Sequence, residues 1–370
     1  RGSWVQDTAG RRYLDMFSSY SALNQGHRHP QIVASLKAQA DRLTLTSRAF
    51  FNDQLGPFLS KLCALTGFSA ALPMNTGSEA VETAIKAARK WAYTIKGVPA
   101  DSAEIVTALG SGHGLTTPNV GLSSKERTYT GFGPFAPGFK DVPFGDVEAI
   151  AAAITPNTAA VLLEPIQVDA GIIIPPEDYL AQVRSLCTAN NVLLILDEIQ
   201  TGLGRTGKMF AFEHADIRPD AIVIGKALGG GILPVSAFVA DREVMDVFSH
   251  EAHGSTFGGN PLSAAVALAA LAVIDDEGLV KRSLEIGTDF MERLRAIDSP
   301  HVDEVRGVGL LIGVEIKRSS GPARAFCESM MASGVLAKDT AEQVIRLAPP
   351  LNIDPIDLDW AMSRIEDVLS

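Results

Sequence analysis

The stretch Ala221-Ile-Val-Ile-Gly-Lys226-Ala-Leu-Gly-Gly-Gly231 carries the strongest indication of the fold. It is a short, β-branched apolar run that ends in a lysine and a glycine cluster, the pattern of a buried strand followed by a tight turn. A second apolar run, Val192-Leu-Leu-Ile-Leu196, ends in the same way, with Asp197 directly behind it. Two parallel strands that end like this place a lysine amine and a carboxylate at one edge of a sheet.

The rest of the middle region alternates short apolar runs with amphipathic helical patterns. Such alternation predicts an α/β domain whose mostly parallel sheet has helices on both faces. We expect further strands at 70–74, 104–109, 159–164 and 235–239, and helices at 79–93 and 176–190. A long apolar helix, 262–276, then leads into mixed helices and short strands at 309–315 and 344–347. We therefore predict an N-terminal segment (1–48) that packs with the small domain, a large domain (49–261) and a smaller α+β domain (262–370).

The composition is typical of a large globular protein, with 370 residues, 46% of them hydrophobic, and a net charge of -11. This acidic balance, without any basic run, argues against binding to nucleic acid or to a membrane surface. Neither a membrane-spanning stretch nor a signal-peptide pattern is apparent, so we expect a cytoplasmic protein. Three widely spaced cysteines (Cys63, Cys187 and Cys327) favour reduced core residues over disulfides, and we expect no bound metal.

Lys226 and Asp197 together suggest a chemistry. An amine at the end of a strand can form a Schiff base with pyridoxal phosphate (PLP), and a neighbouring carboxylate can pair with the protonated pyridine nitrogen of that cofactor. On this segment alone, a surface lysine that keeps its ammonium group in water explains Lys226 equally well.

Two glycine-containing segments bear on a phosphate site. Asn75-Thr-Gly-Ser-Glu79 follows an expected strand and opens an expected helix, with capping-box spacing between Thr76 and Glu79. That helix N-terminus suits a phosphate, although an ordinary helix cap explains the same residues. Gly202-Leu-Gly-Arg-Thr-Gly207 matches the dinucleotide pattern GxGxxG. No long helix follows it, and Asp197-Glu-Ile-Gln200 separates it from the strand, so we interpret it as a loop near the site.

These segments, in this order, resemble the class III, fold-type I PLP aminotransferases, and within them the ornithine δ-aminotransferases. Examples are Leu72-Pro-Met-Asn75-Thr-Gly77 and Glu164-Pro-Ile-Gln167, and the similarity is also dense at 18–30, 43–52, 131–135, 197–202, 225–228, 253–256 and 346–350. The resemblance covers nearly the whole chain. It implies a large domain with a mostly parallel seven-stranded sheet, a smaller α+β C-terminal domain, PLP as the cofactor, and an obligate homodimer.

The resemblance also assigns roles at the cofactor. Lys226 would form the Schiff base and shuttle the proton, Asp197 would keep the pyridine nitrogen protonated, and Gln200 would bond the phenolic oxygen. Thr256 would reach the phosphate from the neighbouring subunit. The full set implied at the cofactor is Lys226, Asp197, Gln200, Thr76, Gly77, Ser78, Gly112, His113, Glu164 and Thr256.

On the substrate side, the resemblance implies that Arg346 receives the α-carboxylate of a 2-oxo acid. A planar guanidinium fork suits that task better than a lysine amine does. Tyr20 would orient the amino acid end of ornithine. The full set implied at the substrate is Tyr20, Phe51, Leu115, Asp169 and Arg346.

Several of these positions depart from the family pattern. Gly112 stands where the family has an aromatic residue stacked on the PLP ring, so His113 is the nearest ring that can cover it. Leu115 stands in place of an arginine that helps hold the substrate carboxylate in the ornithine enzymes. Asp169, after Val168, replaces a glutamate that masks the arginine matched by Arg346, and Phe51 replaces a tyrosine.

The changes gather around the substrate, whereas Lys226, Asp197, Gln200 and Thr256 match the family. We therefore expect an ornithine-type aminotransferase, with an altered substrate as one possibility. A first alternative is a racemase, epimerase, lyase or cyclase of the same fold that acts on a basic or modified amino acid. A second is a non-catalytic dimeric homologue, against which the intact Lys226 argues.

Overall fold

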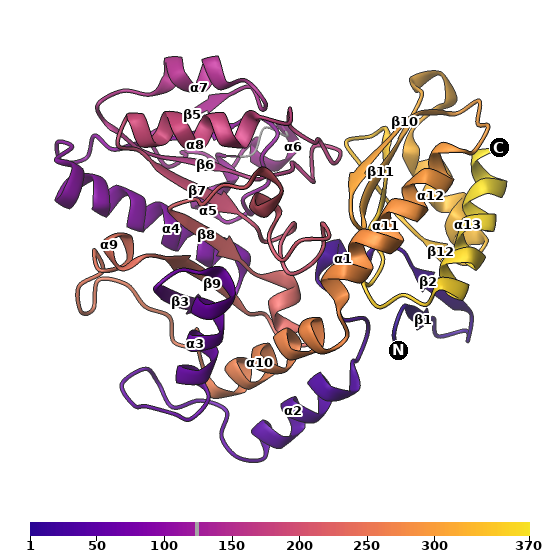
Figure 1. Cartoon of the computed structure of the whole chain (residues 1–370), viewed down its shortest axis with the longest axis horizontal. Helices are drawn as coiled ribbons and strands as arrows, with labels where there is room; N and C mark the ends of the chain where they lie inside the picture. Colours follow the sequence, from indigo (N-terminus) through magenta and orange to yellow (C-terminus); the bar gives the residue numbers. More distant parts are fainter. Residues whose placement is uncertain (123–125) are drawn as a thin grey trace.

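A seven-stranded sheet lies at the centre of the computed structural model, which describes residues 1–122 and 126–370. Its order is β3-β9-β8-β7-β6-β4-β5 (Figure 1). The strands are β3 (Ala70–Met74), β4 (Glu104–Ala108), β5 (Phe139–Val142), β6 (Thr158–Leu163), β7 (Leu193–Asp197), β8 (Ala221–Ile224) and β9 (Ser236–Ala240). Strand β9 runs opposite to the other six strands of this sheet, which are all parallel to one another. The predicted α/β class and mostly parallel sheet are confirmed.

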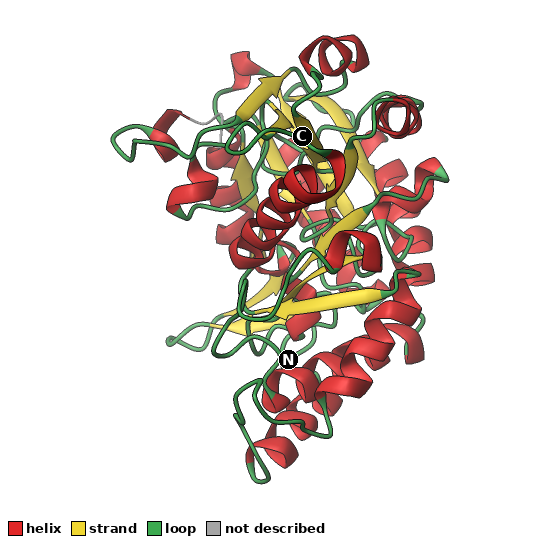
Figure 2. Cartoon of the chain, turned by 90° about the vertical axis from the view of Figure 1, so that its left-hand side faces the viewer, coloured by secondary structure: helices red, strands yellow, loops and turns green. Residues whose placement is uncertain are grey.

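Alternating apolar side chains of these strands face two separate cores. On β7, Leu194 and Leu196 belong to one core, and Leu193 and Ile195 belong to the other. Helix α4 (Gly77–Trp91) contributes to the second core, while α3 (Leu55–Thr66), α8 (Tyr179–Ala189) and α10 (Pro261–Asp276) contribute to the first. The sheet therefore has helices on both faces, as the side view in Figure 2 also shows. Burial of both strand faces is typical of parallel sheets.

Strand β5 was not expected from the sequence. Its four residues, Phe-Lys-Asp-Val, place two charged residues between two apolar ones and do not alternate, and the strand forms an edge of the sheet beside β4. A short edge strand of this kind gives little periodic signal. The strand expected at 309–315 begins instead at Leu311, because Gly309 adopts a positive φ of 58° in a turn.

The C-terminal part forms a second, smaller unit beside the large sheet (Figure 1). A four-stranded antiparallel sheet has the order β10-β11-β14-β13, and a three-stranded sheet has the order β1-β2-β12. Their bounds are β1 (Trp4–Gln6), β2 (Arg12–Asp15), β10 (Val302–Val308), β11 (Leu311–Ile316), β12 (Val335–Leu336), β13 (Lys338–Thr340) and β14 (Val344–Leu347). The helices of this part are α11 (Leu279–Arg295), α12 (Ala323–Ala332) and α13 (Pro355–Leu369).

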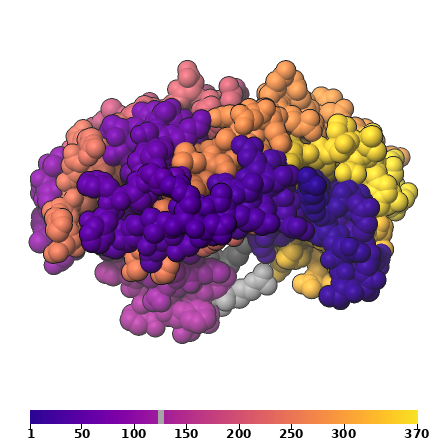
Figure 3. Space-filling model, turned by 90° about the horizontal axis from the view of Figure 1, so that it is seen from below, coloured from indigo at the N-terminus to yellow at the C-terminus, as the bar shows by residue number. Residues whose placement is uncertain are grey.

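The N-terminal segment contacts both units. Strand β2 pairs with β12 of the small unit, whereas α2 (Pro30–Ala40) packs on α10. Figure 3 shows this segment, in indigo, lying across one face of the molecule next to the yellow C-terminal part. The domain boundaries at 48 and 261 stay predictions. No helix in the described part of the chain is long and apolar enough to cross a membrane.

The remaining short elements connect these layers. They are α1 (Ser18–Ser21), α5 (Thr117–Val120), α6 (Glu126–Tyr129), α7 (Val147–Ala153), α9 (Arg242–Met245), η1 (Ala92–Lys96), η2 (Ala211–Ala215), η3 (Lys226–Gly229) and η4 (Arg318–Ser320).

Candidate active site

A cavity of about 640 Å³ opens where the carboxyl ends of β4, β7 and β8 meet the small unit. Parallel sheets bind their ligands at this edge. Eleven of the predicted site residues line the cavity: Tyr20, Thr76, Gly77, Ser78, Gly112, His113, Leu115, Asp169, Gln200, Lys226 and Arg346. The chain brings them together from both units and from the N-terminal segment.

Lys226 begins η3, one residue after Gly225 at the end of β8. Its backbone has a φ of 44°, in the left-handed region that L residues seldom adopt. Such strain often marks a functional position, and here it lies at the point where the chain turns away from the sheet. Burial, and then the positive charge of Arg346, lowers the pKa of the Lys226 amine to about 8. A substantial neutral fraction of this amine is therefore present at mildly alkaline pH.

Asp197 ends β7 and lies next to His113 beneath the cavity. The Nδ1 atom of His113 is 2.8 Å from Oδ2 of Asp197, and the amide of Ile199 donates to Oδ1 of Asp197 at 3.1 Å. Burial alone lowers the pKa of His113, but the hydrogen bond and charge of Asp197 outweigh it, so the pKa of His113 is raised. His113 therefore points toward Asp197, and its Nε2 has no hydrogen-bond partner in the described structure. That His113 covers the PLP ring stays a prediction.

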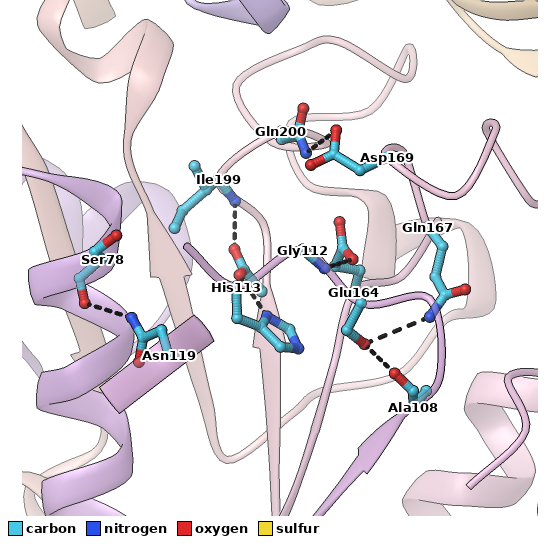
Figure 4. A network of polar contacts seen from close by, with 12 residues as sticks. Ser78, Ala108, Gly112, His113, Asn119, Glu164, Gln167, Asp169, Ile199 and Gln200 are labelled. Carbon is cyan, nitrogen blue, oxygen red and sulfur yellow. Dashed lines mark hydrogen bonds and ion pairs between the residues drawn. The ribbon is translucent and has the colours of Figure 1, made fainter. Parts of the chain in front are cut away.

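Glu164 follows β6 and is buried beside Asp197. The register of β6 with β7 pairs Leu163 with Leu196, so Glu164 and Asp197 are the next residues of neighbouring strands. The amide of Gly112 donates to Oε2 of Glu164 at 2.8 Å (Figure 4). Burial raises the pKa of Glu164 to about 7, and the charge of His113 opposes that shift. Glu164 is thus positioned to hold the backbone of the 112–113 loop.

Arg346, on β14, is almost completely buried at the junction of the units. Its guanidinium donates to Oε1 of Gln200 at 3.0 Å and to Oγ of Ser21 at 2.8 Å. Burial lowers the pKa of Arg346 to about 10, so the group stays charged at neutral pH. The Nε atom of Arg346 has no hydrogen-bond partner in the described structure. A buried guanidinium with an unused donor is suited to receive a carboxylate.

Asp169 approaches Arg346 without forming a close pair. The two side chains are 3.9 Å apart, and Gln200 bridges them by donating to Oδ1 of Asp169 at 3.4 Å. A Cβ atom added at Gly112 would lie only 2.7 Å from Oδ2 of Asp169. The carboxylate therefore occupies the space that any side chain at position 112 would enter (Figure 4).

The N-terminus of α4 forms another wall of the cavity. Thr76 and Glu79 form the predicted capping box, with Oγ1 of Thr76 accepting from the amide of Glu79. The amides of Gly77 and Ser78 lie in the first turn, where backbone donors have no acceptor within the helix. Together with the hydroxyl of Ser78, they form a site suited to a phosphate.

Three predicted residues lie differently from the rest. Phe51 is fully exposed, and Thr256 lines a separate small cavity together with residues 45–48. Within a single chain, neither residue lines the cavity that contains Lys226. Leu115 lines the cavity but exposes 72% of its surface, at the rim. The interface role of Thr256 stays a prediction.

Three groups at the site, those of Ser21, Lys338 and Thr340, were not predicted from the sequence. Ser18 to Ser21 have four consecutive φ values between 49° and 66°, a left-handed turn that brings Tyr20 and Ser21 to Arg346. Lys338 and Thr340 of β13 also line the cavity, and the hydroxyl of Thr340 donates to the carbonyl of Asp169 at 2.9 Å. No local pattern marks these residues, because a serine-rich turn and a three-residue edge strand carry no periodicity.

The GxGxxG segment is a loop, as predicted, and it has a structural task. Arg205 in this loop is fully buried and donates to the carbonyls of Leu310 and Pro349 and to Oδ1 of Asn24. It therefore joins the large unit, the small unit and the N-terminal segment. No dinucleotide site is formed there.

The donor set of the cavity fits PLP. An amine of lowered pKa (Lys226) and a helix N-terminus with a hydroxyl (Ser78) line one cavity, and a carboxylate (Asp197) lies beneath it, bonded to the lining residue His113. They match the aldehyde carbon, the pyridine nitrogen and the phosphate of that cofactor. Gly114 adds to the fit, since a Cβ there would lie 2.3 Å from Oγ of Ser78 and would block that hydroxyl.

Comparison with known proteins agrees with this geometry. The family model described as aminotransferase class-III matches residues 1–369. The ornithine aminotransferases of Brevibacillus brevis and Bacillus subtilis are 58% and 57% identical over 100% of this chain, covering 92% and 91% of their own lengths.

Solved structures give the same result. An ornithine aminotransferase from Toxoplasma gondii, described with partial occupancy of PLP at its active site, superimposes with a TM-score of 0.98 at 42% identity, covering 100% of this chain and 88% of that one. An acetylornithine aminotransferase from Elizabethkingia anophelis has a TM-score of 0.89 at 42% identity, covering 100% of this chain and 91% of that one. The chain belongs to the class III aminotransferases, which are PLP-dependent enzymes.

Proposed function

We propose that this protein is an ornithine δ-aminotransferase-like enzyme that moves the δ-amino group of L-ornithine to a 2-oxo acid. The observation that carries the proposal is the placement of Lys226 and Arg346 in one cavity, with Asp197 beneath it. Amino acids and 2-oxo acids are the substrates that this class uses. The names of the relatives support ornithine as the amino donor.

When PLP is bound, it supplies an electron sink for negative charge on the carbon that carries the amino group. The protein supplies proton transfer and orientation. The neutral fraction of Lys226, whose pKa is about 8, can accept a proton from that carbon and return it elsewhere. Asp197 provides the negative charge that keeps the pyridine nitrogen protonated, and the raised pKa of His113 keeps a hydrogen-bond donor against that carboxylate.

Arg346 and Asp169 support the exchange of two substrates in one cavity. Arg346 is charged, and among the described residues the carboxylate that forms an ion pair with it is that of Asp169, at 3.9 Å. An incoming 2-oxo acid carboxylate can therefore take the place of Asp169 at the guanidinium. When the amino donor is bound with its δ-amine toward Lys226, the ion pair between Arg346 and Asp169 would persist.

We also propose a homodimer that completes the phosphate site. Thr256 lies apart from the Lys226 cavity in one chain, and exposed aromatic residues are close in sequence to residues of its own small cavity: Phe50, Phe51 and Phe257. Apolar exposure of this kind is typical of a subunit interface. Mixing Lys226→Ala with Thr256→Ala chains tests the role of Thr256, because a mixed dimer would regain one complete site. Mixed dimers with no more activity than either parent would refute this role. The cytoplasmic location stays a prediction.

The racemase, epimerase, lyase or cyclase alternative is favoured by one observation: the uncharged residues Gly112 and Leu115 line the cavity. The test is incubation of the holoenzyme with L-ornithine and 2-oxoglutarate in deuterated water. We expect glutamate to form at the rate at which ornithine disappears, and none with Lys226→Ala. Deuterium incorporation at Cα of ornithine without glutamate would contradict the proposal and support the alternative. Family membership and Lys226 argue against a non-catalytic homologue.

A further inference from the structure

One face of the small antiparallel sheet lines the cavity, and its register sets two cations side by side. Arg346 of β14 is paired with Gly313 of β11 on one flank and with Lys338 of β13 on the other. Directly opposed residues of antiparallel strands have Cα atoms about 4.5–5.5 Å apart, with side chains on the same face of the sheet. Lys338 is therefore the neighbour of Arg346 on the cavity side.

The two cations lie at different depths. Both line the cavity, but the Arg346 side chain is 2% exposed and the Lys338 side chain is 40% exposed. The charge of Arg346 acts on the Lys226 amine, which places Arg346 close to the reacting end. Lys338, which is more exposed and belongs to an edge strand of the sheet, is at the mouth of the cavity.

Each of these cations is neutralised by an aspartate that a ligand can replace. Arg346 is 3.9 Å from Asp169, and Nζ of Lys338 is 2.6 Å from Oδ1 of Asp339. In the part of the chain that the structure describes, Nζ of Lys338 contacts only the side chain and carbonyl of Asp339. No contact to another element holds the Lys338 ammonium, so it is available to an anion in the cavity.

Of the cations that line the cavity, Lys338 is the one that remains to bind a second carboxylate. Among the lining residues that the structure describes, the side chains with a cation facing the cavity are Lys226, Lys338 and Arg346. Lys226 is committed to proton transfer, and Arg346 to the carboxylate beside the reacting carbon. Leu115, on the rim, carries no charge.

We propose that Lys338 binds the distal carboxylate of a dicarboxylic 2-oxo acid whose α-carboxylate is held by Arg346. The subsite selects a five-carbon dicarboxylic acceptor such as 2-oxoglutarate over a monocarboxylic one such as pyruvate. It rests on the proposed function, because it assigns the acceptor of that same transamination. Asp339 acts as the competing anion that occupies Lys338 until the acceptor arrives.

Equilibrium binding of two unreactive acids to the holoenzyme tests this subsite without turnover. Glutarate has two carboxylates and butyrate has one. By calorimetry, Lys338→Met should raise the dissociation constant of glutarate about 10-fold, the effect of one lost charge-assisted hydrogen bond, and leave that of butyrate unchanged. Lys338→Arg should retain the glutarate preference. Asp339→Asn should lower the glutarate dissociation constant, because the competing carboxylate is gone, and Lys281→Met, on the exposed surface of α11, should change neither.

Steady-state kinetics give the second readout. Lys338→Met should raise KM for 2-oxoglutarate with little change in kcat, and should leave KM for pyruvate unaltered. An unchanged glutarate preference, or equal losses for glutarate and butyrate, would overturn the subsite while leaving the aminotransferase proposal intact. If the wild-type enzyme transaminates no 2-oxo acid at all, the proposed function fails, and glutarate binding still decides whether Lys338 holds a carboxylate.

Discussion

A methyl group added at Gly112 tests how the substrate side of the cavity is packed. Its carbon would lie 2.7 Å from Oδ2 and 3.4 Å from Cβ of Asp169. Because the site has no room for both groups, the Asp169 carboxylate must turn away from Gly112. It would then lose the hydrogen bond from Gln200 and the ion pair with Arg346.

The expected magnitude follows from two opposing effects. Losing a long hydrogen bond and a partly exposed ion pair costs about 1–2 kcal/mol. Gly112 is not among the positive-φ glycines, so alanine fits its backbone and stabilises by about 0.4–1 kcal/mol through the unfolded chain. Gly112→Ala should therefore destabilise the native protein by about 1 kcal/mol. In an Asp169→Ala background the carboxylate is absent, and Gly112→Ala should then stabilise the native protein.

Thermal unfolding of the wild type, the two single variants and the double variant measures this coupling. At one protein concentration, 1 kcal/mol corresponds to about 1–2 °C in a chain of this size. Gly56→Ala is the matched control, since a Cβ there has nothing within 4 Å, and it should shift Tm equally in both backgrounds. A Gly112→Ala shift of the same sign and size with and without the Asp169 carboxylate would show that the two groups do not compete for this space.

Three further perturbations concern buried charges. Arg205→Met leaves three buried acceptors unpaired and should cost about 3–5 kcal/mol, seen as a large fall in Tm, whereas exposed Arg324→Met should change little. The pKa of Glu164 is raised to about 7, so between pH 4.5 and 7 the folded protein keeps a proton that the unfolded chain releases, and stability falls as pH rises. Glu164→Gln should accordingly raise Tm at pH 8 and not at pH 4.5, and a lower Tm at pH 8 would contradict this. With a Lys226 pKa of about 8, the rate at which the apoprotein binds PLP covalently should rise from pH 7 to 8 and level off above about pH 9, and a rate that still rises as steeply up to pH 10 would contradict the lowered pKa.

Most of the large sheet is predictable because its strands are continuous apolar runs. β3 and β8 coincide with the expected ranges, and β7 differs by a single residue at each end, from 192–196 to Leu193–Asp197. Periodicity identifies such strands because both faces are buried. It cannot identify β5, where four residues at an edge carry two charged side chains.

Some residues of the candidate site can be predicted from the sequence, and others cannot. Lys226 and Asp197 are visible in the sequence because each directly follows an apolar strand. The residues that complete the site, such as Ser21 and Lys338, come from a left-handed turn and a three-residue edge strand, so only the register and the tertiary fold reveal them. The orientation of His113 toward Asp197 is likewise a consequence of packing, since nothing local to residues 112–115 indicates it.

The most direct test of the account follows one nitrogen atom through the reaction. L-ornithine labelled with ¹⁵N at the δ position is incubated with the holoenzyme and 2-oxoglutarate, and the products are observed by NMR. The account predicts that the label appears in glutamate with the wild type and in no product with Lys226→Ala. Label that stays in ornithine or appears as free ammonia, or transfer only from ornithine labelled at the α position, would contradict it.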